Sequence, residues 1–399
     1  TLGAIDIICS DKTGTITQNK MTVKDEYVID EKMLNYICAL CNDGLIYKDK
    51  YVGDPTETCL YAYLYNKKIN SLNLRKKCER LLDVPFDSDR KMFTTLNKID
   101  DNVYVLCKGS MDSLIEKVNL SKTQKEEVLD KVKNFSKNAL RTLGFAYKKL
   151  DYVPKNIKEL EKEENNLSFA GILGMIDPPR KSVKESVALC KNAGIRPIMI
   201  TGDGIDTATT IAKDVGIITS DNEAILGSEL DKYNDKELED IVKKYSVYAR
   251  VNPTHKEKIV FALQSSGKIV AMTGDGVNDA PAIKDAHVGV GMGITGTDVT
   301  KSASDIVLMD DSFSTIVVAI EEGRRIYNNI RNNIVFSLSS NFAEIFTIII
   351  GLFTKTTILL PIYILFIDLV TDSIPSICLS FEKSEDGIMN KKPRGINKP

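Results

Sequence analysis

The chain has 399 residues, of which 43% are hydrophobic and 27% are charged, and its formal net charge is −2. At about 100–200 residues per domain, this length predicts more than one domain. The balanced charge provides no basic face, which argues against a nucleic-acid-binding protein. The eight cysteines are scattered, and the close pair Cys38 and Cys41 has no second pair or histidine cluster beside it. This pattern favours reduced thiols over a zinc site or a disulfide framework.

Three apolar runs end in polar turns that contain aspartate: residues 5–15 (IDIICSDKTGT), 195–204 (IRPIMITGDG) and 268–279 (KIVAMTGDGVND). Each run is continuous rather than alternating, which is typical of parallel strands buried on both faces. A helical pattern that ends at Gly194 lies between the first and second of these strands. Strands that alternate with helices predict a doubly wound α/β sheet, which carries its ligands at the carboxyl ends of the strands. We therefore expect the three aspartate-containing turns to converge.

A second domain of mixed α+β type is predicted for residues 22–167, inserted into the α/β domain formed by residues 1–21 and 168–320. It combines a helical segment (EKMLNYICALCND), two segments read as alternating strands (KMFTTLNKI and NVYVLCKG) and a helix rich in lysine and glutamate over residues 121–138. The charges of that helix are interpreted as a solvated face.

The last quarter of the chain contains two apolar stretches, residues 334–353 and 358–381, each about the 20 residues that a membrane-spanning helix needs. Basic residues flank the pair at both outer ends: Arg324, Arg325, Arg331, Lys383, Lys391, Lys392 and Arg394. By the positive-inside rule both ends are cytoplasmic. Residues 334–381 are thus predicted to form a transmembrane hairpin between a stalk (321–333) and a cytoplasmic tail (382–399). The alternative is a hairpin of core helices in a soluble protein.

Asp11 ends the first predicted strand, where a carboxylate can act as a nucleophile toward phosphorus and form an acyl phosphate. That reaction needs a metal ion and neutralisation of the phosphoryl oxygens. Candidates for these roles are Asp275 and Asp279 as oxygen ligands of Mg²⁺, Thr201 and Gly202 as phosphate hydrogen-bond donors, Lys256 as the fixed positive charge, and Asn278 as an additional amide.

The motifs DKTGT, TGD and TGDGVNDA, in this order, resemble those of the P-type ATPases, whose phosphorylation domain has the haloacid-dehalogenase fold. The resemblance continues through MIDPPR, ARVNPTHK and EEGRRIYNN, covers essentially the whole chain and is closest to the calcium-pump branch. It implies that Asp11 is the phosphorylated residue, that Mg²⁺ is bound by Asp11, Asp275 and the carbonyl group of Thr13, and that Lys12 and Asp203 belong to the catalytic set.

The resemblance also implies that the inserted domain binds ATP. GDPTET places Thr56 and Glu57 near adenine, and PFDSDRK provides Phe86 as the stacking ring with Lys91 nearby. KGS and LRTL place Lys108, Gly109 and Arg141 at the nucleotide, with Arg141 at the phosphates. Ser88 departs from the pattern, because calcium pumps usually have arginine there, and this suggests weaker or rearranged nucleotide binding.

Thr13 distinguishes a pump from a phosphatase. Soluble phosphatases of the same superfamily generally place a second aspartate, the general acid/base, two residues after the nucleophile. Threonine does not deprotonate water near neutral pH, so the aspartyl phosphate is expected to persist. This disfavours the alternative of a membrane-tethered phosphatase, and the intact motifs disfavour a non-catalytic regulatory protein.

Polar residues in the predicted membrane helices are candidate ligands of a transported cation, because such residues are costly in a bilayer. Their oxygen atoms suit a hard cation such as Ca²⁺ or Na⁺, and Pro375 is expected to disturb the helix and free carbonyl groups. The pattern resembles calcium pumps, except that Asp368 is characteristic of the sodium/potassium branch. We expect Ca²⁺, with Na⁺/K⁺ or another cation as the alternative; a third interpretation is that these residues only connect the helices. The set comprises Asn341, Glu344, Asp368, Thr371 and Asp372.

Pumps of this family also have an actuator domain, whose TGE-type loop hydrolyses the aspartyl phosphate, and further membrane helices. The sequence contains neither, so it is expected to be a fragment of a multi-pass membrane pump with cytoplasmic domains. Its expected partners are ATP, Mg²⁺, the transported cation, the lipid bilayer and the remaining parts of the same pump. The fragment alone is expected to bind ATP weakly and to neither transport ions nor turn over phosphate efficiently.

Overall fold

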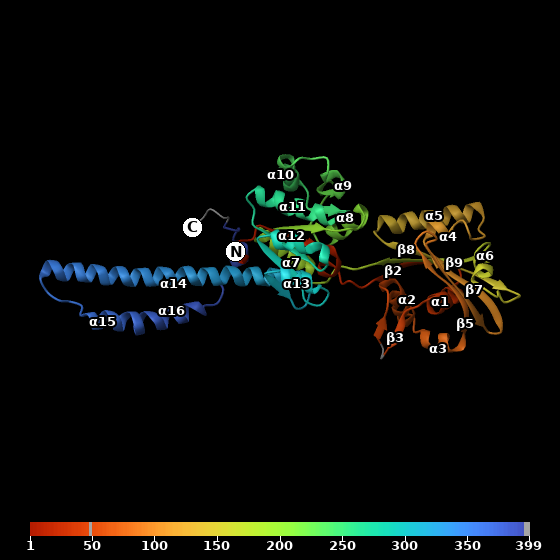
Figure 1. Ribbon diagram of the computed structural model, residues 1–399, viewed down its shortest axis with the longest axis horizontal. Coiled ribbons are helices and arrows are strands. Elements are labelled where there is room, and N and C mark those ends of the chain that lie inside the picture. Colours follow the sequence, from red (N-terminus) through yellow and green to blue (C-terminus); the bar gives the residue numbers. More distant parts are fainter. Residues whose placement is uncertain (48–49, 395–399) are drawn as a thin grey trace. The chain divides into compact units, whose positions relative to one another are not determined.

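The computed structural model describes residues 1–47 and 50–394, without the side chain of Lys50, and divides into two compact units (Figure 1). One unit contains Thr1–Ile16, Lys181–Gly202 and the chain from Ala212 onward. The other contains Thr17–Arg180 and Asp203–Ile211. The chain therefore leaves the first unit after the turn at Lys12–Ile16 that follows its first strand, and it returns after completing most of the second unit.

A seven-stranded parallel sheet forms the centre of the first unit, with strand order β11-β12-β10-β1-β13-β14-β15. The three predicted strands, β1 (Ile7–Asp11), β10 (Arg196–Ile200) and β13 (Val270–Gly274), lie side by side in its middle. The other strands are β11 (Ala224–Leu226), β12 (Val247–Ala249), β14 (Val288–Met292) and β15 (Ile306–Leu308). The predicted parallel α/β sheet is confirmed.

Helices supply the apolar groups that bury this sheet. Ile7, Cys9 and Ile198 of the central strands share one core with Leu238 and Ile259 of the flanking helices. The predicted end of α7 at Gly194 is confirmed, since this glycine has φ +70° just after the helix. The helices of this part of the chain are α7 (Val183–Asn192), α8 (Ile205–Asp214), α9 (Gly227–Leu230), α10 (Asp235–Lys244), α11 (Pro253–Ser265), α12 (Ala280–Asp285) and α13 (Asp298–Ala303).

The second unit is built on a six-stranded antiparallel sheet with the order β2-β9-β8-β7-β6-β5. Two separate cores pack against it, one with α1, α2 and α3 and the other with α4, α5 and α6. The sheet is therefore covered on both faces, and the predicted mixed α+β architecture is confirmed. Its strands are β2 (Thr22–Val28), β5 (Glu79–Asp87), β6 (Met92–Ile99), β7 (Asn102–Gly109), β8 (Arg141–Leu150) and β9 (Ser168–Ile176).

The helices of this unit are α1 (Glu31–Leu40), α2 (Pro55–Asn66), α3 (Ser71–Lys77), α4 (Met111–Leu114), α5 (Lys122–Lys137) and α6 (Ile157–Lys162), with a small hairpin of β3 (Leu45–Tyr47) and β4 (Lys50–Val52). Because both faces of the sheet are covered, the expected alternation in β6 is wrong: all of its residues except Lys98 are buried. Thr94, Thr95 and Asn97 are enclosed with the apolar residues.

The long helix α14 (Phe313–Thr354) has 42 residues and a length of about 63 Å at 1.5 Å per residue. The following segment consists of α15 (Pro361–Phe366), a π-helical turn at Ile367–Asp372 and α16 (Ser373–Ser380), and α16 packs along α14 (Figure 1). Phe313–Thr354 and Pro361–Ser380 are long and apolar enough to cross a membrane. Only 6% and 0% of their most apolar windows are buried, which disfavours the alternative of a soluble core hairpin.

Candidate active site

Asp11 is the last residue of the central strand β1, and its register places it opposite Ile200, the last residue of β10. Its backbone N–H donates to the hydroxyl oxygen of Thr273 in β13 (3.2 Å), and its Oδ1 atom accepts from the N–H of Thr13 (3.3 Å). The strand end thereby fixes the carboxylate between its two neighbouring strands. This is the edge at which open α/β sheets bind their ligands.

Lys256 connects Asp11 to Asp279. Its Nζ atom donates to Oδ2 of Asp11 (2.6 Å) and to Oδ1 of Asp279 (2.7 Å), and its side chain is 9% exposed. The lysine lies in the first turn of α11, whose start is fixed by a capping box between Asn252 and His255. Asn252 accepts from the His255 N–H (2.8 Å), and Nδ1 of His255 accepts from the Asn252 N–H (3.3 Å). The cap thus holds the turn from which Lys256 reaches the strand end.

Burial and charge act in opposite directions on this cluster. Burial alone would lower the pKa of Lys256, but the negative charges of Asp11 and Asp279 outweigh it and raise that pKa above its usual value. The pKa of Asp275 is also raised, first by burial and then by repulsion from Asp11 and Asp279. The neighbouring carboxylates thus favour the charged form of Lys256, and the site has an excess of carboxylate, which favours a cationic ligand.

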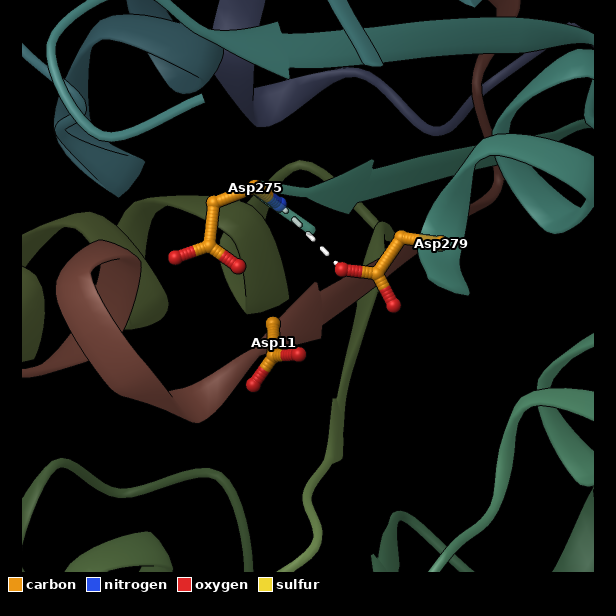
Figure 2. Close-up of side chains that lie close together, drawn as sticks. All are labelled: Asp11, Asp275 and Asp279. Carbon is orange, nitrogen blue, oxygen red and sulfur yellow. Dashed lines mark hydrogen bonds between the residues drawn. The ribbon is translucent and has the colours of Figure 1, made fainter. Parts of the chain in front are cut away.

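The three carboxylates of Asp11, Asp275 and Asp279 converge in the space at the strand ends (Figure 2). One oxygen atom from each lies within 4.8 Å of the others. Carboxylate oxygens are the ligands that Mg²⁺ prefers, so this donor set fits the ion that the sequence predicted. Asp279 also accepts from Lys256 and from two backbone N–H groups, whereas Asp275 is the acid whose carboxylate faces Asp11 in Figure 2.

The turn that carries Asp275 is fixed by contacts that sequence analysis missed. Oδ2 of Asp279 accepts from the N–H groups of Asp275 (3.2 Å) and Gly276 (3.1 Å). Gly274 is required here, because a Cβ atom would lie 2.4 Å from that of Asp279. From α13, the buried Thr300 hydroxyl donates to the carbonyl oxygen of Gly276 (3.0 Å). The motif TGDGVND indicated the acids, but nothing in the sequence linked Thr300 to them.

The remaining predicted catalytic residues lie near the same edge with different exposure. Thr201 follows Ile200 directly and is 2% exposed, and its N–H donates to the carbonyl oxygen of Tyr248 (2.9 Å). Gly202 has open space where a Cβ would stand, so the backbone there is accessible to a ligand. Asn278 is exposed, Asp203 is half-buried, and Lys12 is buried in the turn after β1.

In the second unit, Lys108 and Glu57 form a buried ion pair. Nζ of Lys108 lies 2.5 Å from Oε1 of Glu57 and 5.1 Å from the centre of the Phe93 ring, and the lysine is 4% exposed. Gly109 allows the neighbouring strand to approach, since a Cβ atom would stand 2.7 Å from the carbonyl oxygen of Lys91. The structure thus brings Glu57, Lys108 and Gly109 together, whereas Thr56 is half-buried at the start of α2.

Phe86, Lys91 and Arg141 are the exposed members of the predicted nucleotide set. Phe86 lies near the end of β5 and is 65% exposed, which leaves its ring face free for stacking. Lys91 has φ +54° in the turn between β5 and β6, and the N–H of Ser110 donates to its carbonyl oxygen (3.0 Å). Arg141 begins β8.

A buried carboxylate that sequence analysis missed holds the turn between β5 and β6. Glu164 is 1% exposed and is paired with Arg90 and with Lys117 (3.0 Å). Arg90 also donates to the carbonyl oxygens of Pro85 (2.8 Å) and Met92 (3.0 Å), on either side of the turn. Arg90 therefore holds the loop, and it does not take over the role of the arginine that calcium pumps usually have at the position of Ser88. The adjacent basic residues Arg90 and Lys91 looked alike in the sequence.

The candidate cation ligands lie on α14 and on the π-helical turn after α15. Glu344 is half-buried, and the charges that act on it are those of Asp368 and Asp372. The π-helical turn Ile367–Asp372 contains Asp368, Thr371 and Asp372, and such turns are frequent at functional sites. Asn341, Asp368 and Thr371 are exposed in this structure. The helix is irregular just before Pro375, where disturbance was expected.

Comparison with known proteins identifies relatives over nearly the whole chain. Residues 31–182 match the family model described as the P-type ATPase cytoplasmic domain N, and residues 356–399 match the model for the C-terminus of cation-transporting ATPases. A calcium-transporting ATPase 1 of Bacillus cereus is 44% identical over 98% of this chain and 47% of its own length. A calcium-transporting ATPase 1 of Lactococcus lactis is 42% identical over 100% of this chain and 48% of its own.

Relatives whose names indicate other transported ions are also found. The human potassium-transporting ATPase alpha chain 2 is 36% identical over 100% of this chain and 46% of its own length. The chain spans about half the length of the curated relatives it matches.

Proposed function

Because the chain belongs to the P-type ATPases, we propose that it carries the ATP-dependent catalytic site and part of the ion-binding site of a cation pump that works through an aspartyl phosphate on Asp11. The observation that carries this proposal is the cluster at the end of β1. There, one buried lysine joins Asp11 to Asp279, and Asp275 completes a set of three converging carboxylates.

In the proposed reaction a carboxylate oxygen of Asp11 attacks the γ-phosphorus of ATP. A new O–P bond forms, the bond from that phosphorus to the β–γ bridging oxygen breaks, and ADP leaves with the electron pair. Lys256 neutralises negative charge beside the attacking carboxylate, and the hydroxyl of Thr201 and the N–H of Gly202, with the amide of Asn278, donate hydrogen bonds to the phosphoryl oxygens. Mg²⁺, held by Asp11, Asp275 and the Thr13 carbonyl group, would supply further neutralisation when bound.

Thr13 explains why the phosphoryl group would remain on Asp11 instead of being hydrolysed. Its N–H donates to Oδ1 of Asp11, but its side chain has no group that removes a proton from water near neutral pH. The remaining members of the proposed catalytic set are Lys12, Asp203 and Asp279. An acyl phosphate that persists can be coupled to a conformational change, as a pump requires.

The second unit is proposed to bind ATP. Phe86 offers an exposed ring for adenine, and Lys91 and Arg141 are exposed cations for the phosphates. The pair of Lys108 and Glu57 lies beside Gly109, and we include these three residues and Thr56 in the proposed site.

The proposed cargo is Ca²⁺, bound by oxygen atoms of Asn341, Glu344, Asp368, Thr371 and Asp372. The curated relatives named calcium-transporting support this assignment. Asp368 and the potassium-transporting relative favour the second candidate, a pump of Na⁺, K⁺ or another cation. In both cases the hairpin spans a membrane and the two domains built on the seven-stranded and six-stranded sheets are cytoplasmic, because basic residues flank both outer ends of the hairpin.

Phosphorylation by γ-labelled ATP, measured on the protein that contains this chain, tests the proposal. We expect an acid-stable, hydroxylamine-sensitive label that depends on Mg²⁺ and Ca²⁺. A label that needs Na⁺ instead would support the second candidate. Absence of a label, together with release of phosphate from simple phosphate esters, would favour a membrane-tethered phosphatase.

A further inference from the structure

The seam between α14 and α16 has polar side chains on both sides. On α14, Asn329, Asn333 and Ser337 are spaced four residues apart, and Glu344 follows seven residues later, so all four share one helix face. Opposite them, Ser380 and Ser376 continue the same spacing back to Asp372. Two rows of hydrogen-bonding groups therefore lead toward the carboxylates.

A groove of about 480 Å³ lies in this seam. Ile326, Ile330, Ile334 and Leu338 form its apolar walls, and the polar side chains between them are those of Asn329, Asn333, Ser337, Ser376 and Ser380. Since one water molecule occupies about 30 Å³ in the liquid, the groove has room for several.

At the outer end of the groove, direct hydrogen bonds join α14 to the end of α16. Nδ2 of Asn329 donates to the carbonyl oxygens of Ser380 (3.2 Å) and Glu382 (2.9 Å), and the residue is 6% exposed. One helical turn further into the groove, such direct hydrogen bonds to the described residues are not made by the next asparagine. The side-chain oxygen of Asn333 is shielded from solvent and accepts no hydrogen bond from the residues that the structure describes.

Eleven residues further along α14, the Oε1 atom of Glu344 is also shielded from solvent and also accepts no hydrogen bond from the described residues. A shielded acceptor without a donor costs roughly 1–3 kcal/mol. Two such oxygens along one polar seam indicate that mobile donors or cations satisfy them. Water and a hydrated cation have this chemistry.

The charge of the seam favours a cation. Glu344 lies within the electrostatic influence of Asp368 and Asp372, and residues 334–353 and 358–381 contain no lysine, arginine or histidine to balance them. The carboxylates therefore attract positive ions along the seam. At 1.5 Å per residue, the path from Asn333 to Glu344 is about 16 Å long, roughly half the thickness of a bilayer core.

We propose that the groove between α14 and α16 is a hydrated entry route, through which a hydrated metal cation reaches the intramembrane carboxylates from the cytoplasmic side. This inference rests on the proposed function as a cation pump. In this route Asn333, Ser337 and Ser376 replace part of the hydration shell during passage, and they are not ligands of the final site. They should therefore control how fast the cation arrives rather than how tightly it is held.

Thiol accessibility tests the route directly. Cys378 is the exposed cysteine of this chain and the other seven are buried, so Cys378→Ala, with any reactive cysteine outside this chain removed, provides the background. Single cysteines are placed at Asn333, Ser337 and Ser376. Matched controls are Val335→Cys and Phe342→Cys, since these residues of α14 are both 57% exposed and do not line the groove. The whole protein in native membranes is then treated with charged, membrane-impermeant thiol reagents.

We expect the three groove cysteines to react with a cationic reagent at least about tenfold faster than the controls, and faster than with an anionic reagent. Reaction at the control rate would overturn the route, because lipid or protein then fills the seam. Phosphorylation by labelled ATP in the same membranes separates the two proposals. Phosphorylation with unreactive groove cysteines contradicts the route alone, whereas reactive groove cysteines without phosphorylation contradict the pump.

A second variant is independent of thiol chemistry. Asn333→Leu combined with Ser337→Ala makes the seam apolar, so Ca²⁺ should trigger phosphorylation at least about fivefold more slowly at an unchanged half-saturating concentration. The control is Val335→Leu on the outer face. An unchanged rate in the double variant, or an altered half-saturation with an unchanged rate, would contradict an entry route.

Discussion

Lys256 donates a hydrogen bond of 2.6 Å to Asp11, although the two residues are 245 positions apart in the sequence. The contact exists because α11 begins beside the end of β1, and the same amino group also reaches Asp279 at 2.7 Å. With this lysine charged and buried, the three carboxylates at the strand end are partly neutralised before any ligand arrives.

Replacing Lys256 by methionine should therefore impair phosphorylation while keeping the volume of the side chain. Asp11 and Asp279 would lose their shared cation, and removal of one preorganised electrostatic group typically costs about a hundredfold or more in rate. The measurement is the rate of label incorporation from γ-labelled ATP. Lys258→Met is the matched control, because Lys258 is on the same helix and pairs with Asp231 away from the cluster. Equal rates in the two variants would contradict the role of Lys256.

The substitution Asp11→Asn tests the nucleophile itself. An amide does not form an acyl phosphate, so the acid-stable, hydroxylamine-sensitive label should disappear completely. Nucleotide binding should remain, since the proposed nucleotide residues belong to the other unit. Persistence of the label at wild-type level would show that Asp11 is not the phosphorylated residue.

The sequence predicted the aspartate-bearing strand ends because continuous apolar runs followed by polar turns report directly on a parallel sheet. The contacts that hold these turns could not be predicted from the sequence. Thr300 supports the Asp275–Gly276 turn across 24 positions, and Asn252 with His255 fixes the start of α11. These contacts depend on tertiary packing rather than on periodicity, so no local sequence pattern predicts them.

The inserted domain also has features that the sequence does not predict. Glu164 lies in a segment rich in charged residues, yet it is 1% exposed and is paired with Arg90 and Lys117. Likewise, alternation was expected in β6, where both faces are in fact covered by helices. Burial on two sides depends on which helices return to the sheet, and that information is not local.

Phe86→Ala should weaken ATP binding by roughly tenfold, because stacking of a base on an aromatic ring contributes about 1–3 kcal/mol. Phe86→Tyr should retain affinity, since the ring face is kept. Affinity is measured by titration with ATP or a fluorescent analogue. Tyr65→Ala is the control, an aromatic residue of the same unit that is 72% exposed. A loss of equal size in the control would contradict stacking at Phe86.

Arg90→Met should destabilise the second unit and disorder the turn between β5 and β6. Removing one partner of a buried ion pair typically costs about 3–5 kcal/mol when the other charge is left without compensation. The loss should be smaller here, because Lys117 still pairs with Glu164 (3.0 Å). The thermal transition of the unit should fall, and ATP affinity should fall with it through Phe86 and Lys91. The double variant Arg90→Met with Glu164→Gln should recover part of the stability, since it removes the stranded charge. Strictly additive losses would contradict direct coupling of the pair.

Asp311 predicts a pH dependence of stability. Its carboxylate is 1% exposed and accepts from the N–H groups of Gly293 (2.7 Å), Ile294 (3.0 Å) and Thr295 (2.8 Å), and from the hydroxyl of Thr295 (2.9 Å). Burial opposes the charge, but these donors outweigh it and lower the pKa of Asp311. A folded-state pKa below the unfolded value of about 3.9 means that the stabilisation is complete above that value and is lost as the pH falls through the folded pKa.

Asp311→Asn should therefore lower the melting temperature at pH 7, and the difference from wild type should shrink as the pH falls below about 4. The measurement is a series of thermal melts from pH 7 to pH 3 on both proteins. Asp130→Asn is the control, since the side chain of Asp130 is 79% exposed and should give no difference at any pH. A wild-type advantage over Asp311→Asn that stays constant down to pH 3 would mean that the carboxylate charge does not hold the loop at 293–295. The difference would then come from the number of acceptor oxygens, since an asparagine side chain has nearly the same shape as aspartate but offers one acceptor oxygen instead of two.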